Sequence, residues 1–153
     1  MRFTIKTFIP GKSPQEVFAH FGEPLFRVLS PGFPRITIIR FDGCRLNDET
    51  HIDMQFFGKR RWVSVNTAFS EKEQEIYFID EGKTLPLGLK RWKHCHRVVA
   101  APGGSIIRDE VEFDYGNFVL NVFWKIPLWI PFAMRPVKYR RFFEQLTAGN
   151  TLR

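Results

Sequence analysis

The chain has 153 residues, a length that fits one domain with a hydrophobic core, and we predict a single domain over residues 1–153. Its composition, 44% hydrophobic and 16% aromatic with 17 phenylalanines, excludes a disordered chain. The net charge of +7 would suit an anionic partner, but basic residues are scattered among acidic and apolar ones, and no nucleic-acid motif occurs. We therefore predict solvated strand and helix faces, and no nucleic-acid partner.

The cysteines and the apolar runs exclude further classes. Only Cys44 and Cys95 are present, too few for a disulfide framework and not in a CxxC arrangement. The N-terminus lacks the long apolar run of a secretory signal. The most apolar stretch, Phe118–Met134, is interrupted by Asn121, Lys125 and two prolines and is short for a membrane span. We therefore expect a cytoplasmic protein.

The first predicted elements are a strand and two short helices. Alternating apolar and polar residues predict the strand, and Pro10-Gly11 ends it. A helix start follows, with Ser13 as the cap, Pro14 at the first position and Glu16 three residues after the cap. The predicted bounds are Arg2–Ile9 for the strand, Ser13 to about Phe21 for the first helix, and Leu25–Ser30 for the second.

Six strands joined by short turns follow, which indicates an antiparallel meander. The first four are predicted at Ile36–Asp42, Thr50–Phe57, Arg61–Phe69 and Glu75–Glu81. The last two lie between Leu85 and Tyr115 and form a hairpin whose turn is Pro102-Gly103-Gly104.

The hairpin carries the strongest pattern. Because side chains of a strand alternate between faces, Trp92, His94 and His96 share one face. A turn centred on Pro102-Gly103 pairs His96 with Asp109, His94 with Val111, and Trp92 with Phe113. A cluster of two histidines and one aspartate among aromatic residues is thus predicted on the inner face of the sheet. A slip of one residue would move Asp109 to the outer face.

Beyond Gly116-Asn117 we predict a long helix over about Leu128–Thr147 that ends at Gly149-Asn150. Its apolar stripe is predicted to contain Ile130, Ala133, Met134, Val137 and Leu146, and its polar face Lys138, Arg140, Arg141 and Glu144. Pro136 inside this segment predicts a kink or a later helix start.

This order of elements resembles the helix-grip fold of the START-like superfamily, also called SRPBCC, which includes the birch-pollen allergen. The likeness to its bacterial ligand-binding or polyketide-cyclase-like branch spans nearly the whole chain. It is carried by Ser13-Pro14-Gln15-Glu16-Val17-Phe18, Leu85-Pro86 before Trp92-x-His94-x-His96, Asp109-x-Val111-x-Phe113, and Arg135 before Tyr139-Arg140-Arg141-Phe142-Phe143. Pro136 inside the terminal helix departs from the pattern.

The resemblance implies an α+β fold in which a curved, seven-stranded antiparallel sheet surrounds a long C-terminal helix and an internal cavity. The implied order is one strand, two helices, six strands and one helix. Members of the superfamily bind lipids, sterols, polyketides or plant hormones in the cavity, and some catalyse cyclisation or hydration. The catalytic residues differ between branches, so none is carried over.

The predicted cluster of His94, His96 and Asp109 allows several chemistries. A carboxylate beside histidine supports acid/base catalysis, and two histidines with one carboxylate can bind a metal. A buried aspartate also needs a partner for purely structural reasons. Since no zinc-protease motif, Cys/His quartet or nucleophile elbow occurs, we predict no metal and no cofactor. The first hypothesis is a polar anchor or structural cluster, and catalysis is the alternative.

Aromatic side chains are candidates for the wall of a ligand pocket, although core packing alone also explains each of them. The predicted wall residues are Phe56, Trp62, Phe78, Trp92, Val111 and Phe113. Trp124 and Trp129, near Lys125 and Arg135, are expected at a cavity mouth, at an interface, in plain core, or in an exposed patch able to touch a membrane. His20, His51 and Asp80 are expected at the surface or in turns.

The sequence therefore predicts a protein that binds a small hydrophobic ligand between sheet and helix, as a carrier or sensor. The alternatives are an enzyme of the cyclase or hydratase type that uses His94, His96 and Asp109, and an adaptor that contacts membranes through the Trp124/Trp129 segment. The sequence identifies neither the ligand nor the oligomeric state.

Overall fold

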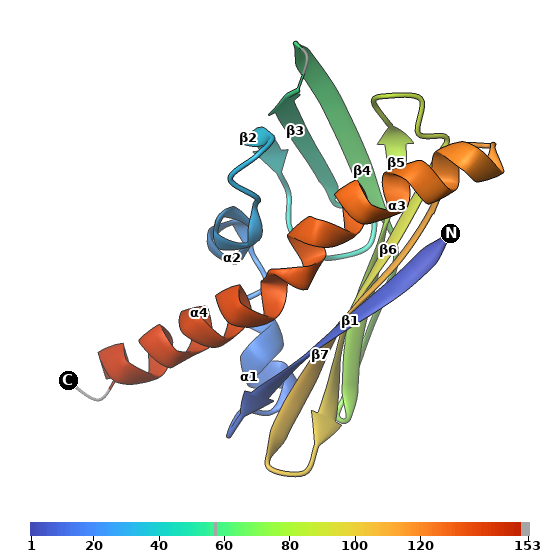
Figure 1. Cartoon of the computed structure of the whole chain (residues 1–153). Helices are drawn as coiled ribbons and strands as arrows, with labels where there is room; N and C mark the ends of the chain where they lie inside the picture. The colour runs from blue at the N-terminus through green and yellow to red at the C-terminus, as the bar shows by residue number, and fades with distance from the viewer. Residues whose placement is uncertain (57, 151–153) are drawn as a thin grey trace.

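The computed structural model describes residues 1–56 and 58–150, in which one antiparallel sheet of seven strands packs against four helices (Figure 1). The elements are β1 (Arg2–Pro10), α1 (Pro14–Phe18), α2 (Glu23–Leu29), β2 (Arg35–Phe41), β3 (Glu49–Gln55), β4 (Lys59–Lys72), β5 (Glu75–Thr84), β6 (Arg91–Ala101), β7 (Gly104–Asp114), α3 (Phe118–Ala133) and α4 (Arg135–Asn150). Phe57, the predicted end of the second meander strand, lies outside the described residues.

The sheet confirms the predicted meander. Its strand order is β1-β7-β6-β5-β4-β3-β2, so neighbours in sequence pair from β2 to β7 and β1 joins the free edge of β7. The hairpin register is also confirmed, because His96 pairs with Asp109, His94 with Val111, and Trp92 with Phe113. Strands β4 and β5 extend beyond their predicted ends, to Lys72 and Thr84.

The first helix begins where predicted. Ser13 Oγ accepts a hydrogen bond from the Glu16 N–H at 3.2 Å, and the Glu16 carboxylate accepts one from the Ser13 N–H at 2.7 Å. The helix ends at Phe18 rather than Phe21, because the chain turns through tighter hydrogen bonds there before Gly22 adopts an extended conformation and α2 begins.

The C-terminal helical segment begins ten residues earlier than predicted. The Asn117 side chain accepts hydrogen bonds from the N–H groups of Val119 (2.9 Å) and Leu120 (3.3 Å) and so caps α3. The prolines that suggested a break, Pro127 and Pro131, lie inside this helix. The carbonyls they leave without an N–H belong to exposed residues, where water can bond them. The predicted interruption near Pro136 is confirmed, since α3 ends at Ala133 and α4 begins at Arg135.

The predicted apolar stripe of this segment is wrong for three of its five residues, whereas Leu146 packs against the core as predicted. Ile130, Met134 and Val137 are 48%, 55% and 52% exposed. The residues that face the sheet are instead Phe132, Arg135, Tyr139 and Phe143, which recur at three-, four- and four-residue intervals and bury larger side chains than the predicted set. The polar face is confirmed for Arg140, Arg141 and Glu144, which are exposed, whereas Lys138 is half-buried and donates to the carbonyls of Leu29 and Ser30.

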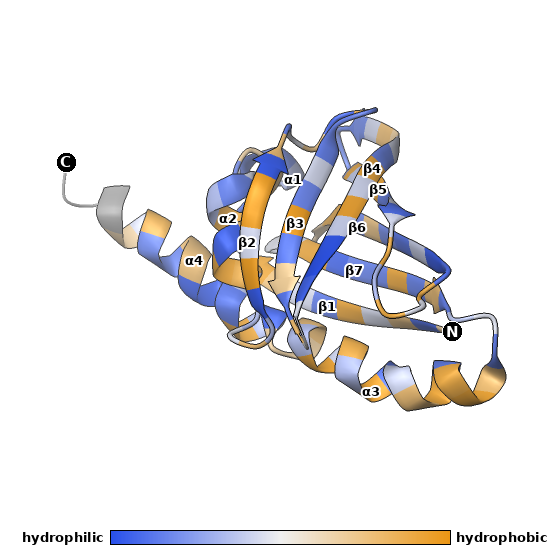
Figure 2. Ribbon diagram, turned by 90° about the horizontal axis from the view of Figure 1, so that it is seen from above, coloured by the Kyte–Doolittle hydropathy of each residue, from blue (hydrophilic) through white to orange (hydrophobic). Residues whose placement is uncertain are grey.

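The core has two parts, which lie at the two ends of the concave sheet. One gathers α1, α2 and α4 around Val17, Ile76 and Tyr139, and the other packs α3 against Trp92 and Phe113. Viewed from above, α3 and α4 run along one side of the sheet, and α3 is hydrophobic over most of its surface while α4 alternates (Figure 2). Of the helices within residues 1–56 and 58–150, none is both long and apolar enough to cross a bilayer.

Candidate functional site

A cavity of about 470 Å³ lies between the concave face of the sheet and helices α2 and α3. This volume is in the range of small-molecule sites. The predicted wall and anchor residues that line it are Phe56, Trp62, Phe78, Trp92, His94 and His96. Three others, Asp109, Val111 and Phe113, are not part of the lining and are buried behind it on β7.

Aromatic side chains hold one another in place around the cavity. The Trp62 and Trp92 rings, from β4 and β6, meet edge to face with centroids 5.0 Å apart. The Phe78 ring stacks on the His96 imidazole, with centroids 4.3 Å apart and planes inclined by 7°. Trp124 of α3 stacks on Tyr115 and closes the wall on the helix side.

Five residues form what we call the polar cluster: Asp80, His94, His96, Asp109 and Arg135. Its buried part joins three elements. His94 Nε2 of β6 lies 2.9 Å from Asp109 Oδ1 of β7, and Arg135 Nη1 of α4 donates to the same oxygen at 2.5 Å. All three side chains are at most 10% exposed, so this ion pair fastens the start of α4 to the sheet.

The other part of the polar cluster faces the cavity. Asp80 Oδ1 lies 3.0 Å from His96 Nε2 and 3.4 Å from His94 Nδ1, and Trp92 Nε1 donates to Asp80 Oδ2 at 3.2 Å. The two imidazole centroids are 3.6 Å apart. Asp80, His94, His96 and Arg135 all contribute to the cavity lining, which places hydrogen-bonding groups in an otherwise aromatic wall.

Two members of the cluster were missed in the sequence analysis. Asp80, expected at the surface or in a turn, is on β5 opposite His94, within the strand predicted at Glu75–Glu81. The alternation Ile76, Phe78, Asp80 is the signal that would have placed it on the inner face. Arg135 was expected beside the Trp124/Trp129 segment, where it could contribute to an exposed patch, but it is buried, and its spacing of four residues to Tyr139 puts it on the buried face of α4.

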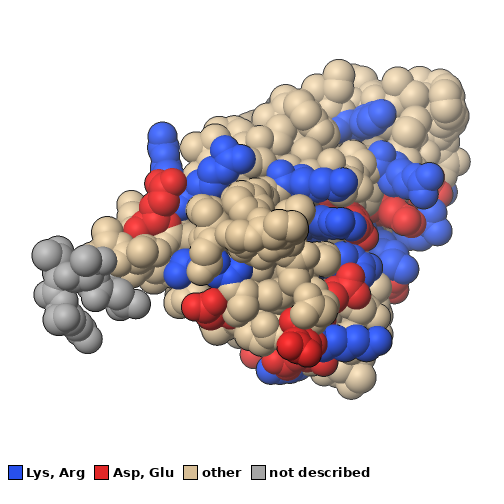
Figure 3. Space-filling view, turned by 90° about the horizontal axis from the view of Figure 1, so that it is seen from below, with Lys and Arg blue, Asp and Glu red and all other residues tan. Residues whose placement is uncertain are grey.

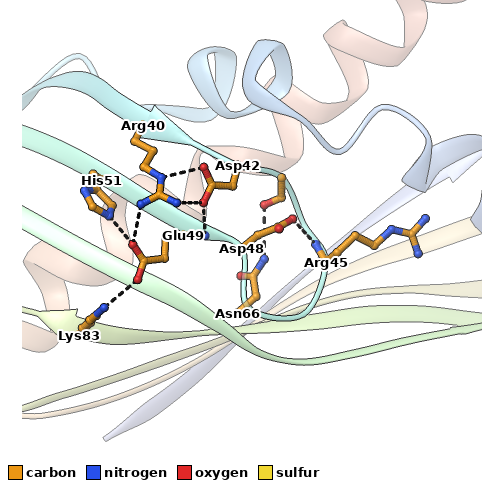
Figure 4. Close-up of polar contacts among 9 residues, drawn as sticks. Arg40, Asp42, Arg45, Asp48, Glu49, His51, Asn66 and Lys83 are labelled. Carbon is orange, nitrogen blue, oxygen red and sulfur yellow. Dashed lines mark hydrogen bonds and ion pairs between the residues drawn. The ribbon is translucent and has the colours of Figure 1, made fainter.

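Of the two other residues expected at the surface or in turns, one is confirmed and one is wrong, and neither lines the cavity. His20 is exposed. His51 is half-buried on β3, where its ring lies 2.8 Å from Glu49. Figure 4 shows that Glu49 also pairs with Arg40 and Lys83. The Lys83 hydrogen bond, followed by that of His51, lowers the pKa of Glu49 to about 2. We interpret this network as structural, because it joins β2, β3 and β5 away from the cavity.

Burial and charge set the protonation of the polar cluster. Burial lowers the pKa of His94 to about 4, with His96 adding to the effect, so His94 is neutral near pH 7. Burial alone would raise the pKa of Asp109, but the Arg135 guanidinium and the His94 hydrogen bond outweigh it and hold that pKa well below its ordinary value. In the same way, burial would raise the pKa of Asp80, but the His96 hydrogen bond, the nearby His94 and His96 rings and the Trp92 hydrogen bond together outweigh it and lower that pKa.

These states define what the site offers chemically. A neutral imidazole has a single N–H, and the nearer carboxylate of the two that flank His94 is Asp109. Asp80 is an anionic acceptor at the cavity wall, and His96 is an imidazole held by it. The wall can therefore accept a proton or a hydrogen bond from a bound molecule and donate one to it.

The same groups could hold a metal ion. Asp80, His94 and His96 each offer one ligand atom, and these atoms lie within 4.8 Å of one another. Two imidazoles and one carboxylate suit first-row transition metals. The carboxylate in this set is Asp80 rather than Asp109, the one considered from the sequence.

Comparison with known proteins identifies the fold. No protein-family model matches the sequence, and no curated protein matches it significantly. A solved nucleoside-diphosphate sugar epimerase from Corynebacterium glutamicum has a TM-score of 0.67 at 19% identity, over 97% of this chain and 30% of that one. The di-domain ARO/CYC protein StfQ from the steffimycin biosynthetic pathway has a TM-score of 0.66 at 12% identity, over 96% and 52% of the two chains.

A third structure, a Thalictrum norcoclaurine synthase, has a TM-score of 0.61 at 16% identity, over 96% of this chain and 97% of its own. This chain therefore spans about a third and about half of the first two proteins and nearly all of the third. Together with the strand order and the C-terminal helices, these similarities establish that the chain has the helix-grip fold of START-like, or SRPBCC, proteins.

Proposed function

We propose that the protein binds a small hydrophobic ligand in the cavity between the sheet and α3, with Asp80, His94 and His96 anchoring a polar group of the ligand. The observation that carries this proposal is the cavity of about 470 Å³, whose aromatic wall is interrupted by these three hydrogen-bonding side chains. Apolar walls with a few convergent polar groups are typical of small-molecule sites.

The chemistry of the anchor narrows the ligand class. Asp80 is an anionic acceptor, so a ligand carboxylate beside it is disfavoured, whereas a hydroxyl can donate to it. The imidazole of His96 can bond the same hydroxyl or a neighbouring carbonyl. We therefore expect an apolar, uncharged molecule with a hydroxyl or carbonyl at one end. The Thalictrum synthase, in complex with a transition-state analogue, is an example of a ligand held by a protein of this fold.

The experiment is native mass spectrometry of the purified protein, followed by organic extraction and identification of the bound molecule. We expect an apolar molecule at one copy per chain. The double variant His94→Ala/His96→Ala should lose at least about tenfold in ligand retention, the value of one or two hydrogen bonds. His51→Ala is the matched control, since His51 is outside the cavity.

Two outcomes would contradict the proposal. A purified protein that is empty, and that also fails to bind an uncharged, apolar fluorescent probe such as Nile red, would rule out the cavity as a binding site. Equal retention by wild type and His94→Ala/His96→Ala would rule out the anchor while leaving the apolar wall as the binding determinant.

A second candidate is acid/base catalysis on the bound ligand, of the cyclase or hydratase kind. The observation that favours it is the carboxylate–imidazole pair of Asp80 and His96, 3.0 Å apart and open to the cavity. Such a pair can take a proton from a ligand carbon or hydroxyl and return it. Turnover of an unsaturated ketone, reduced about 100-fold or more in Asp80→Asn with binding retained, would support it. If the protein binds a panel of such ketones without turning any of them over, catalysis is excluded and the carrier function remains.

A further inference from the structure

The outer face of α3 is apolar and uncovered. We use this name for nine side chains that are each between 42% and 74% exposed: Phe118, Val119, Leu120, Val122, Phe123, Ile126, Trp129, Ile130 and Met134. They fall within 17 consecutive residues, whereas scattered single apolar residues are the normal state of a protein surface. A helix that is apolar all round is expected to be covered on every side.

The opposite face of the same helix is a wall of the cavity. Trp124, Leu128 and Phe132 of α3 line it, and Ile130 of the outer face reaches its edge, while Phe123 and Ile126 do not line it. The helix therefore separates the cavity from the surroundings, with apolar side chains on both of its faces. Figure 1 shows α3 crossing in front of the sheet with no other element outside it.

Positive charge accompanies this apolar face. Residues 115–150 contain five lysines and arginines and one glutamate, and one of the five, Arg135, is buried against Asp109. Arg140 and Arg141 are exposed on α4, the continuation of α3, and Lys125 is exposed on α3 itself. Figure 3 shows a ridge of uncharged side chains along its upper right edge, where α3 runs, with lysines and arginines beside it.

This combination has a physical interpretation. Helices that lie in the interface of a bilayer carry apolar and aromatic residues on one side and basic residues near the headgroups. Tryptophan, such as Trp129, is favoured at headgroup level. Each basic residue near an anionic membrane adds to the attraction between protein and lipid. A second copy of this chain would instead bring two positively charged segments together, which opposes self-association through this face.

We propose that α3 is a docking helix for an anionic lipid surface, and that the ligand of the cavity is exchanged with that surface past this helix. The exchange of ligand with the membrane rests on the proposed function. The docking surface is the outer face of α3, and the basic residues of α4 supply its affinity for anionic headgroups.

The test is co-sedimentation of the full chain with phosphatidylcholine vesicles that either contain or lack phosphatidylserine. We expect binding to the anionic vesicles, weakened by added salt because exposed charges are screened. The variant Phe123→Ser/Ile126→Ser should bind at least about tenfold more weakly, since it removes two large apolar side chains that the bilayer would bury. The matched control is Phe8→Ser/Ile39→Ser, which changes the same residue types at exposed positions on β1 and β2.

The outcomes separate docking from ligand binding. Equal vesicle binding by Phe123→Ser/Ile126→Ser and Phe8→Ser/Ile39→Ser would overturn the proposal. The proposal would also be overturned if the protein did not bind vesicles and formed a dimer that Phe123→Ser/Ile126→Ser converts to a monomer. The outer face of α3 would then be an interface between two copies of the chain. If the protein carries a ligand but does not bind vesicles, membrane docking is overturned and the proposed function stands. If the protein binds vesicles but its cavity is empty and binds no fluorescent probe, ligand exchange and the proposed function are both overturned.

Discussion

The two halves of the C-terminal helical segment have the same length and opposite chemistry. Helix α3 and helix α4 have 16 residues each. On α4 the exposed face carries Arg140, Arg141 and Glu144, and the buried face carries Tyr139 and Phe143. On α3 the sole charged residue is Lys125, and both faces are apolar. Helix α4 has the amphipathic pattern of a helix that lies between a protein core and water, whereas α3 has no polar face.

The junction between the two helices explains how they remain in one segment. Arg135, the first residue of α4, pairs with Asp109 of β7 and lies over the Phe132 ring of α3 at 4.0 Å. One buried guanidinium therefore fixes the end of one helix, the start of the next and the sheet. We infer that α4 is the structural half of the segment and that the outer face of α3 is free to serve a function.

The largest effect is expected when this junction is broken. Arg135→Ala leaves the Asp109 carboxylate buried without its positive partner, which should lower the free energy of unfolding by about 3 to 5 kcal/mol. Urea denaturation followed by circular dichroism measures it. Arg141→Ala, exposed on the same helix, should stay within about 0.5 kcal/mol of wild type.

A second variant tests the reason for this loss. The double variant Asp109→Leu/Arg135→Met removes both charges and should recover part of the stability lost in Arg135→Ala. If the single variant remained within about 1 kcal/mol of wild type, the ion pair would not be what holds α4 to the sheet.

The next prediction compares the effect on stability of truncating one phenylalanine from each helix. Phe143 of α4 is 3% exposed and Phe123 of α3 is 65% exposed. Phe143→Ala should lower the free energy of unfolding by about 3 kcal/mol, because it opens a cavity in the core. Phe123→Ala should change it by at most about 0.5 kcal/mol. A large loss in Phe123→Ala would mean that the outer face of α3 is part of the core, which would contradict the division between the helices.

The two helices also mark what the sequence could and could not predict. The strands and the hairpin register follow from alternation within short stretches, so the inner-face positions of Trp92, His94 and His96 could be predicted. The buried face of α4 could not, because the sheet beneath it decides which stripe is covered. Arg135 is buried since Asp109, 26 residues away, supplies a countercharge that no local pattern contains.

In the candidate site, too, the features set by local sequence patterns could be predicted and those set by tertiary contacts could not. Two histidines and Asp109 were grouped correctly because one turn connects their strands. Asp80 was missed although it lies inside the predicted strand Glu75–Glu81, because its burial depends on hydrogen-bonding partners on β6, His96 and Trp92, that the local pattern of β5 does not contain. The start of α3 was misplaced for a related reason, since prolines inside a helix are tolerated where the freed carbonyls meet water.

An effect of intermediate size is expected on acidification. In the folded protein the pKa of His94 is about 4, below its ordinary value of 6.5. Between these values the unfolded chain binds a proton that the folded chain does not, so stability is complete above about pH 6.5 and falls as the pH falls towards 4. The loss should reach about 3 kcal/mol, measured by urea denaturation at a series of pH values.

Other charged groups face His94 and fix the sign of this prediction. They are Asp80 of β5, His96 of β6, Asp109 of β7 and Arg135 of α4. The lowered pKa values of Asp80 and Asp109 act in the same direction at still lower pH, since protonating either carboxylate favours unfolding. In His94→Gln the slope between pH 6.5 and pH 4 should flatten. An unchanged slope would show that His94 titrates normally in the folded protein.

The smallest effect is expected at the centre of the buried face of α4. The Tyr139 side chain is fully buried, and within the part of the chain that the structure describes its hydroxyl has no hydrogen-bond partner. Burial raises the pKa of Tyr139, so the group stays neutral and contributes mainly its ring. Tyr139→Phe should therefore be neutral or stabilise the protein by up to about 1 kcal/mol, whereas Tyr139→Ala should cost about 3 kcal/mol or more. A loss above about 1 kcal/mol in Tyr139→Phe would instead mean that the hydroxyl donates to Asp109, whose Oδ2 is also unpartnered, and that α4 is held by a second polar contact beside Arg135.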